Sequence, residues 1–145
     1  MSIEKITRQS VLDLLMGEWA AYVARFQGLS PAAQAAFLEK QGYKRFADLL
    51  AHIVAWWEEG LQAIPRYKND PAARQPEIDV DSFNARAVEK VREVGEVEET
   101  KVFEETRRKF IEVVNELSED NFTDERILNQ IRWELVNHLA DHRIH

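Results

Sequence analysis

Apolar residues recur every three or four positions over long stretches of this chain, and this spacing constrains the fold more than any other feature. It places apolar side chains on one face of an α-helix, whereas a β-strand alternates them every second residue. The segment from about Lys44 to Ile64 is the clearest case, because two apolar stripes lie next to each other. The first stripe is Phe46, Leu50, Ile53, Trp57, Leu61 and Ile64, and the second is Leu49, His52 and Trp56. This wide apolar face predicts a deeply buried helix that Pro65 ends.

Turn-forming residues are scarce, since the 145-residue chain has 5 Gly and 4 Pro, fewer than an all-β protein needs. Similar apolar stripes predict a first helix over about Thr7–Gln27, which Gly28 ends. A short second helix is expected after Ser30 and Pro31, because serine suits an N-cap and proline suits the first helical position. Gly42 is expected to end this short helix.

The second half of the chain predicts further long helices. Asp81 or Ser82 is expected to cap a helix that Gly95 interrupts or kinks, and the apolar stripe resumes over Glu96–Leu117. A short turn then leads into a last helix over about Asp124–Arg143.

Residues 65–80 hold three prolines and little periodicity, which predicts a long surface loop between the second and third long helices. Loops of this length are often functional, but a plain crossover between two helices explains this one equally well. We therefore expect an all-α fold in a single domain, 1–145. Its architecture would be a helix bundle of four long helices and one short extra helix, with a long crossover between helices 2 and 3.

The composition excludes several classes of protein. The chain has no cysteine, and therefore no disulfide, no thiolate nucleophile and no cysteine-based metal site. Its formal net charge of −7 argues against direct binding of nucleic acid. No apolar run is long enough to span a membrane, and the polar start Met1–Ser10 does not read as a signal peptide. We expect a cytoplasmic protein that binds neither nucleic acid nor a membrane.

Three of the four histidines fall on apolar stripes. His138 and His142 are four residues apart on the last predicted helix, so their Cβ atoms lie about 5–6 Å apart on one face. Two imidazoles at this spacing can bind one metal ion. His52 lies on an inward face of the second long helix, and a bundle core brings residues of facing helices together. The three histidines therefore predict a three-nitrogen site, although histidines are also buried in cores without a metal.

Aromatic residues are candidates for the wall of a pocket beside this site. Trp56, one helical turn after His52, is the residue that we expect there. The other candidates are expected mostly in the core or in a dimer interface. These residues are Trp19, Tyr22, Trp57 and Trp133.

Acidic residues are candidates for supporting roles. Asp48 and Asp141 are the carboxylates nearest to the histidines in the sequence, and either could accept a hydrogen bond from a ligand's second ring nitrogen. Solvated helix positions explain both residues more simply. Glu18 and Glu59 are weaker candidates, in the role of a general base.

Several stretches of the chain carry recognisable patterns. Phe46–Trp57, FADLLAHIVAWW, is an apolar helix with a central histidine and an aromatic residue four positions later. Asn137–His142, NHLADH, contains the pattern H-x-x-[DE]-H, and VDSFN at Val80–Asn84 lies between these two stretches. The first two resemble the second-helix signature and the closing element of the DinB/YfiT-like four-helix-bundle superfamily. The third resembles the link region of its ClbS/DfsB-like branch.

This resemblance implies an up-down-down-up order of the four long helices and a divalent metal held by His52, His138 and His142. It also implies a homodimer, because members of the superfamily often dimerise. Characterised relatives include thiol-dependent transferases and isomerases, and the ClbS/DfsB-like branch is linked to protection against a reactive natural product. A family of such varied reactions does not settle the substrate or the chemistry.

Two functions of different classes follow from these patterns. Three nitrogen ligands leave a coordination position for water or substrate, which is typical of a catalytic site. Imidazole ligands suit zinc, nickel, copper or iron, and of these we expect zinc or nickel. The first function is therefore a metal-dependent enzyme that acts on a small molecule by hydrolysis or by thiol transfer. The alternative is a non-catalytic bundle without metal, which binds a small molecule or has a structural role as a dimer.

Overall fold

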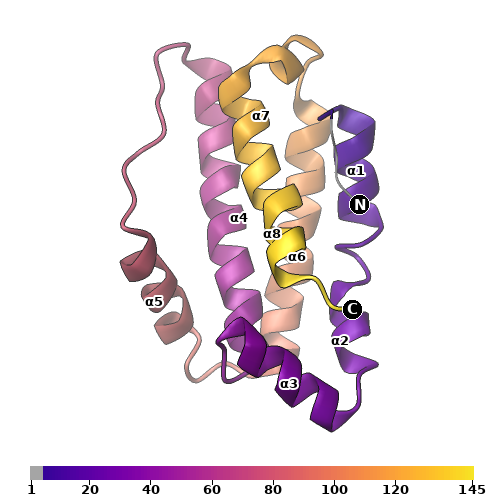
Figure 1. Ribbon diagram of the computed structural model, residues 1–145. Helices are drawn as coiled ribbons and strands as arrows, with labels where there is room; N and C mark the ends of the chain where they lie inside the picture. The colour runs from indigo at the N-terminus through magenta and orange to yellow at the C-terminus, as the bar shows by residue number, and fades with distance from the viewer. Residues whose placement is uncertain (1–4) are drawn as a thin grey trace.

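The computed structural model describes residues 5–145, and within this range the chain forms helices and no strand (Figure 1). The α-helices are α1 (Arg8–Met16), α2 (Tyr22–Gln27), α3 (Pro31–Gln41), α4 (Phe46–Asn69), α5 (Val80–Lys90), α6 (Glu96–Glu116), α7 (Glu125–Ile131) and α8 (His138–His142). The chain also forms a 3-10 helix, η1 (Asp120–Thr123), and a π-helix, η2 (Arg132–Asn137). The all-α prediction is confirmed. The polar segment Met1–Ser10, which argued against a signal peptide, lies partly outside the described residues, because residues 1–4 are not described.

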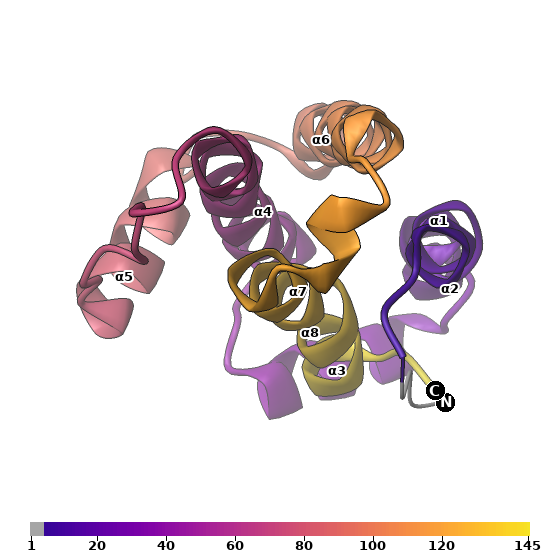
Figure 2. The same cartoon turned by 90° about the horizontal axis from the view of Figure 1, so that it is seen from above.

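The helices form a bundle around one apolar core. Helix α4 packs against α6 on one side and against α7 on another, and α1 packs against α6 (Figures 1 and 2). Helix α5 lies on the outer side of α4, while α3 crosses the end of the bundle at which α4 begins. None of the described helices is both long enough and apolar enough to cross a lipid bilayer. The long helices therefore enclose the core, and α3 and α5 border it.

The predicted first helix is broken in the middle, so the prediction of one continuous helix over Thr7–Gln27 is wrong. Thr7 caps α1 by accepting a hydrogen bond from the Ser10 amide, and Gly17 ends it. A turn over residues 17–21 separates α1 from α2. A Cβ atom on Gly17 would lie 2.7 Å from the Asp13 carbonyl oxygen, so a side chain does not fit there. The break positions Trp19 in the core, where it is fully buried.

Pro65 does not end the third predicted helix, because α4 continues through it to Asn69. The last turn is held from outside the helix. Arg126 Nη2 donates to the Tyr67 carbonyl oxygen at 2.9 Å, and Tyr67 itself is buried. Arg126 Nη1 donates to the carbonyl oxygens of Asp70 and Ala73 just beyond the helix. Tertiary contacts therefore stabilise the end of the helix beyond Pro65.

The link between α4 and α5 covers residues 70–79, which is shorter than the predicted loop of 65–80. Asp79, and neither Asp81 nor Ser82, is the N-cap of α5, since its side chain accepts from the Ser82 amide at 3.1 Å. Helix α5 ends at Lys90, and Gly95 becomes the N-cap residue of α6. The predicted interruption near Gly95 is therefore a full break between two helices.

The last predicted helix is present without a break over α7, η2 and α8, starting after the Asp124 N-cap. Its middle turn is a π-helix, and two carbonyl oxygens of this turn accept hydrogen bonds from tryptophans. Trp57 Nε1 donates to Glu134 at 2.8 Å, and Trp19 Nε1 donates to Leu135 at 2.9 Å. π-Turns often occur at functional sites, and this one directly precedes His138.

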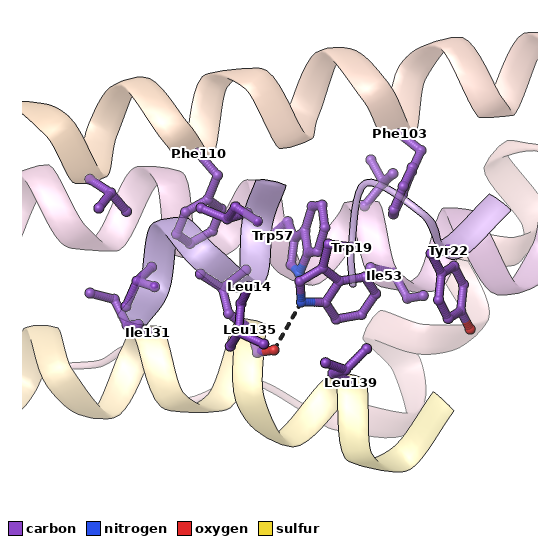
Figure 3. Close-up of a cluster of buried hydrophobic side chains, with 14 of the residues drawn as sticks. Leu14, Trp19, Tyr22, Ile53, Trp57, Phe103, Phe110, Ile131, Leu135 and Leu139 are labelled. Atoms are coloured by element: carbon purple, nitrogen blue, oxygen red, sulfur yellow. Dashed lines mark hydrogen bonds between the residues drawn. The ribbon is translucent and has the colours of Figure 1, made fainter. Parts of the chain in front are cut away.

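The centre of the core is aromatic (Figure 3). The rings of Trp19 and Trp57 meet edge to face, with their centroids 4.8 Å apart. Phe103 of α6 stacks on Trp57 at 5.1 Å, and Tyr22 lies 5.3 Å from Trp19. These rings are buried completely or almost completely. Of the two places expected for Trp19, Tyr22 and Trp57, the core or a dimer interface, the structure places them in the core.

Candidate metal centre

His52, His138 and His142 meet at one place, although they come from two separate parts of the chain. His52 lies in the first half of α4, while His138 and His142 are the first and last residues of α8. One ring nitrogen of each histidine lies within 4.8 Å of a ring nitrogen of both others. The ring centroids are 5.0 Å apart for His52 and His142, and 5.5 Å apart for His52 and His138. The structure therefore brings together the three residues that the sequence selected.

All three imidazoles are held in the neutral form that a metal requires. His52 is only 7% exposed, and the other two are partly buried. Burial, together with the charges of the neighbouring histidines, lowers the pKa of His52 to about 4 and that of His138 to about 3. Burial also lowers the pKa of His142 below its ordinary value. At neutral pH each ring therefore has an unprotonated nitrogen.

An asparagine sets which nitrogen of His52 is free. The side-chain oxygen of Asn84, on α5, lies 2.7 Å from Trp56 Nε1 and 3.1 Å from His52 Nδ1. Because an indole N–H can only donate, the asparagine atom facing it must be the oxygen. His52 Nδ1 must then also donate to this oxygen and carry the proton. Its Nε2 atom has a free lone pair as a result.

A glutamine does the same for His142. Gln41, the last residue of α3, places its side-chain oxygen 2.7 Å from His142 Nδ1. Its side-chain nitrogen donates to the Asp141 carbonyl oxygen at 3.2 Å, which fixes the orientation of the amide. His142 Nδ1 therefore donates to Gln41, and Nε2 of His142 is also free to bind a metal.

His138 differs from the other two histidines. Its Nδ1 atom is buried and has no hydrogen-bond partner among residues 5–145. The nearest acidic oxygen is Oε1 of Glu134, at 3.9 Å, which is too far for a hydrogen bond. Glu134 is itself 1% exposed, and burial raises its pKa to about 8.

A cavity of about 360 Å³ opens beside the three histidines. Trp56 lies in its wall, as expected, and so does Trp133, which is 51% exposed. No lysine or arginine of the described part of the chain lines it. The full lining consists of Gln41, Tyr43, His52, Trp56, Val80, Asn84, Trp133, Glu134, Asn137, His138, Asp141 and His142.

The structure removes several weaker candidates from the site. Asp48 is buried and accepts from Arg45 at 2.7 Å, so neither the supporting role nor the solvated position suggested for it fits. Glu18 is paired with Arg143 at 3.1 Å, and Glu59 lies outside the lining of the histidine cavity. Asp141 lines the cavity but is exposed, as a solvated helix residue would be.

Three residues near the histidines were missed by the sequence analysis. Asn84 and Gln41 belong to other helices, and no spacing rule connects them with the histidines. Glu134, in contrast, lies four residues before His138, and the same spacing that links His138 with His142 could have identified it.

The arrangement provides three unprotonated nitrogens at the edge of an open cavity, with two of the rings fixed in orientation by amide oxygens. This donor set fits zinc or nickel, and the cavity gives space for a further ligand. Comparisons of the chain with protein-family models, curated proteins and solved structures found no match.

Proposed function

We propose that this protein is a metal-dependent enzyme that acts on a small molecule by hydrolysis or by thiol transfer. Its metal centre is a divalent ion, zinc or nickel, held by His52, His138 and His142. One observation carries the proposal: three buried or partly buried neutral imidazoles converge within 4.8 Å, and hydrogen bonds direct the free nitrogens of two of them. A histidine that only fills a core does not need this arrangement.

The chemistry follows from the ligand set. When bound, a divalent metal on three nitrogens supplies Lewis acidity, which lowers the pKa of water or a thiol and polarises a carbonyl group. The chain itself contributes the orientation of the rings through Asn84 and Gln41. His52 is buried and the other two histidines are partly buried, and all three line the cavity.

The lining of the cavity indicates the kind of substrate. Trp56, Trp133 and Tyr43 offer apolar ring surfaces, while Asn84 and Asn137 offer amide groups. Without a lysine or arginine in the described lining, the cavity does not favour a multiply charged anion. We propose a small substrate with a flat or apolar body and one group that can coordinate a metal.

Metal analysis tests this function. The protein is purified without an affinity tag or chelator, and its metal content is measured for the wild type, His138→Ala and His145→Ala. His145 is exposed and is not part of the cluster, so His145→Ala is the matched control. We expect close to one zinc or nickel ion per chain in the wild type and the control, and loss of that ion in His138→Ala. No metal in the wild type after incubation with zinc and nickel would contradict the proposal.

The second candidate function is small-molecule binding without catalysis. The aromatic walls of the cavity favour it, because they suit an apolar ligand whether or not a metal is present. A metal-free wild type that still binds an apolar fluorescent dye, and loses the dye in Trp56→Ala, would support this alternative.

Three finer points belong to the same proposal. We propose the up-down-down-up order of a four-helix bundle, a relationship to the DinB/YfiT-like superfamily, and a cytoplasmic homodimer. The ligand triplet His52, His138 and His142 supports the relationship, because it matches the positions that the resemblance implies. The mass of the protein by light scattering after gel filtration tests the dimer, since a monomer has 16.9 kDa.

A further inference from the structure

The three histidines of the proposed metal centre are not equally supported. Two of them donate from Nδ1 to the oxygen of a neutral amide, Asn84 for His52 and Gln41 for His142. His138 has no such partner among the described residues, although its Nδ1 is buried. Ligating histidines almost always donate their second ring N–H to an acceptor, which fixes the ring and raises its basicity. Among the described residues, His138 therefore lacks the hydrogen-bond acceptor that His52 and His142 have.

Glu134 is the residue in position to supply this acceptor. It lies in η2, one turn before His138 on the same helical face, and its Oε1 atom is 3.9 Å from His138 Nδ1. Its other carboxyl oxygen, Oε2, accepts a hydrogen bond from Gln130 Nε2 at 3.1 Å. The carboxyl group is thus anchored through one oxygen, while the other faces the unpaired ring nitrogen.

A glycine in α4 makes room for this carboxyl group. A Cβ atom on Gly60 would lie 2.9 Å from Oε2 of Glu134 and 3.0 Å from its Cγ atom. Any larger residue would therefore displace the Glu134 side chain. Gly60 lies inside a long helix, where glycine is unfavourable relative to alanine. Close packing of Glu134 gives this otherwise unfavourable glycine a physical reason.

We propose that Glu134, seated against Gly60 and held by Gln130, is the positioning residue of His138 and accepts its Nδ1–H when the metal binds. The inference rests on the proposed metal centre. A movement of about 1 Å brings the 3.9 Å separation into the range of a hydrogen bond. Nε2 of His138 is then the ligand atom, as in the other two histidines. The site would combine two ligands oriented by amide oxygens with one oriented by a carboxyl oxygen.

Zinc affinity, measured by competition with a chromogenic chelator, tests the role of Glu134. The variants are Glu134→Gln, Glu134→Leu and Gly60→Ala, with Glu112→Gln as the matched control because Glu112 is exposed. We expect a loss of about 10–100-fold for Glu134→Leu. Gly60→Ala should show a similar loss, since it displaces the carboxyl group without changing any ligand or Glu134 itself. Glu134→Gln should lie between these and the wild type, because its single amide oxygen can accept from Gln130 or from His138 but cannot replace both carboxyl oxygens.

A second measurement separates positioning from direct ligation and from misfolding. The visible absorption spectrum of the cobalt(II)-loaded protein reports the coordination number, which should be the same in the wild type and Glu134→Gln. Urea unfolding of the metal-free variants shows whether each one folds. If Glu134→Leu does not fold, Gly60→Ala and Glu134→Gln still test the inference.

The outcomes distinguish the two proposals. A wild type that binds zinc while all folded variants bind it with unchanged affinity would overturn the role of Glu134 and leave the metal centre intact. A change of coordination number in Glu134→Gln would also overturn it, because Glu134 would then be a ligand. A wild type that binds no zinc would overturn both proposals.

Discussion

The last helix presents two contrasting sides. On the core side, the carbonyl oxygens of Glu134 and Leu135 accept hydrogen bonds from the buried indoles of Trp57 and Trp19. On the cavity side, His138 holds a buried ring nitrogen without a partner, next to an open cavity. The first arrangement is complete in itself and stabilises the fold. On the second side, the buried Nδ1 atom of His138 makes no hydrogen bond to the described residues, which lowers the stability of the fold. Such an unsatisfied polar atom is typical of a binding site.

Removal of an indole on the core side should have the largest effect on stability. Trp57→Ala deletes a fully buried ring and its hydrogen bond, and should lower the free energy of unfolding by about 3–5 kcal/mol. His138→Leu in metal-free protein should change it by less than about 1 kcal/mol, since it removes an unpaired polar group and restores apolar volume. Urea denaturation measures both. Equal losses in the two variants would contradict the contrast between the two sides.

Loss of the amide that orients His52 should weaken metal binding substantially. Asn84→Ala leaves both His52 Nδ1 and Trp56 Nε1 without their acceptor. Zinc affinity should fall by about 10–100-fold, and chelator competition measures this change. The control is Asn115→Ala, because Asn115 is exposed on α6 and should leave the affinity unchanged. An unchanged affinity in Asn84→Ala would show that His52 does not need this partner.

Zinc affinity should respond weakly to mild acid. The pKa values of His52 and His138 lie near 4 and 3, and that of His142 is also lowered, so protons compete for the rings only at low pH. Between pH 7.5 and 5.5 the affinity should fall by less than about tenfold. Three solvated histidines with an ordinary pKa of about 6.5 would lose roughly 1,000-fold over this range. Zinc titrations at several pH values between 5.5 and 7.5 distinguish these two cases, and a loss of about 1,000-fold would contradict the lowered pKa values.

The ion pair of Glu18 with Arg143 should matter least. Both side chains are partly exposed, so Glu18→Gln should change the free energy of unfolding by less than about 1 kcal/mol. Zinc affinity should stay as in the wild type. A clear loss of catalytic activity in this variant, once a reaction is found, would return Glu18 to the list of candidate bases.

Periodicity predicted the fold well where the local sequence determines it. Ser30 caps α3 and Gly42 ends it with a positive φ of 82°, both as expected. The predictions failed where distant contacts decide. Arg126 holds the end of α4 beyond Pro65, and the buried Trp19 lies in a break of the first helix. Neither contact leaves a signal in the residues next to it.

The candidate site shows the same division. His138 and His142 were recognisable because four residues separate them on one helix, and His52 because it lies on an apolar stripe. Asn84 and Gln41 were not, because α5 and α3 reach the histidines only through tertiary packing. Spacing on a helix thus identifies candidate ligands, whereas Asn84 and Gln41 can be identified only from the structure.

X-ray absorption at the zinc edge tests the central claim most directly. The spectrum of the zinc-loaded protein should contain the scattering of three imidazole rings around one ion per chain. In His142→Ala, loaded with enough zinc to occupy the weakened site, the number of rings around the ion should fall to two, because His142 is one of the three converging residues. A wild type with fewer than three imidazoles around the zinc, or a spectrum unchanged in His142→Ala, would contradict the proposed metal centre.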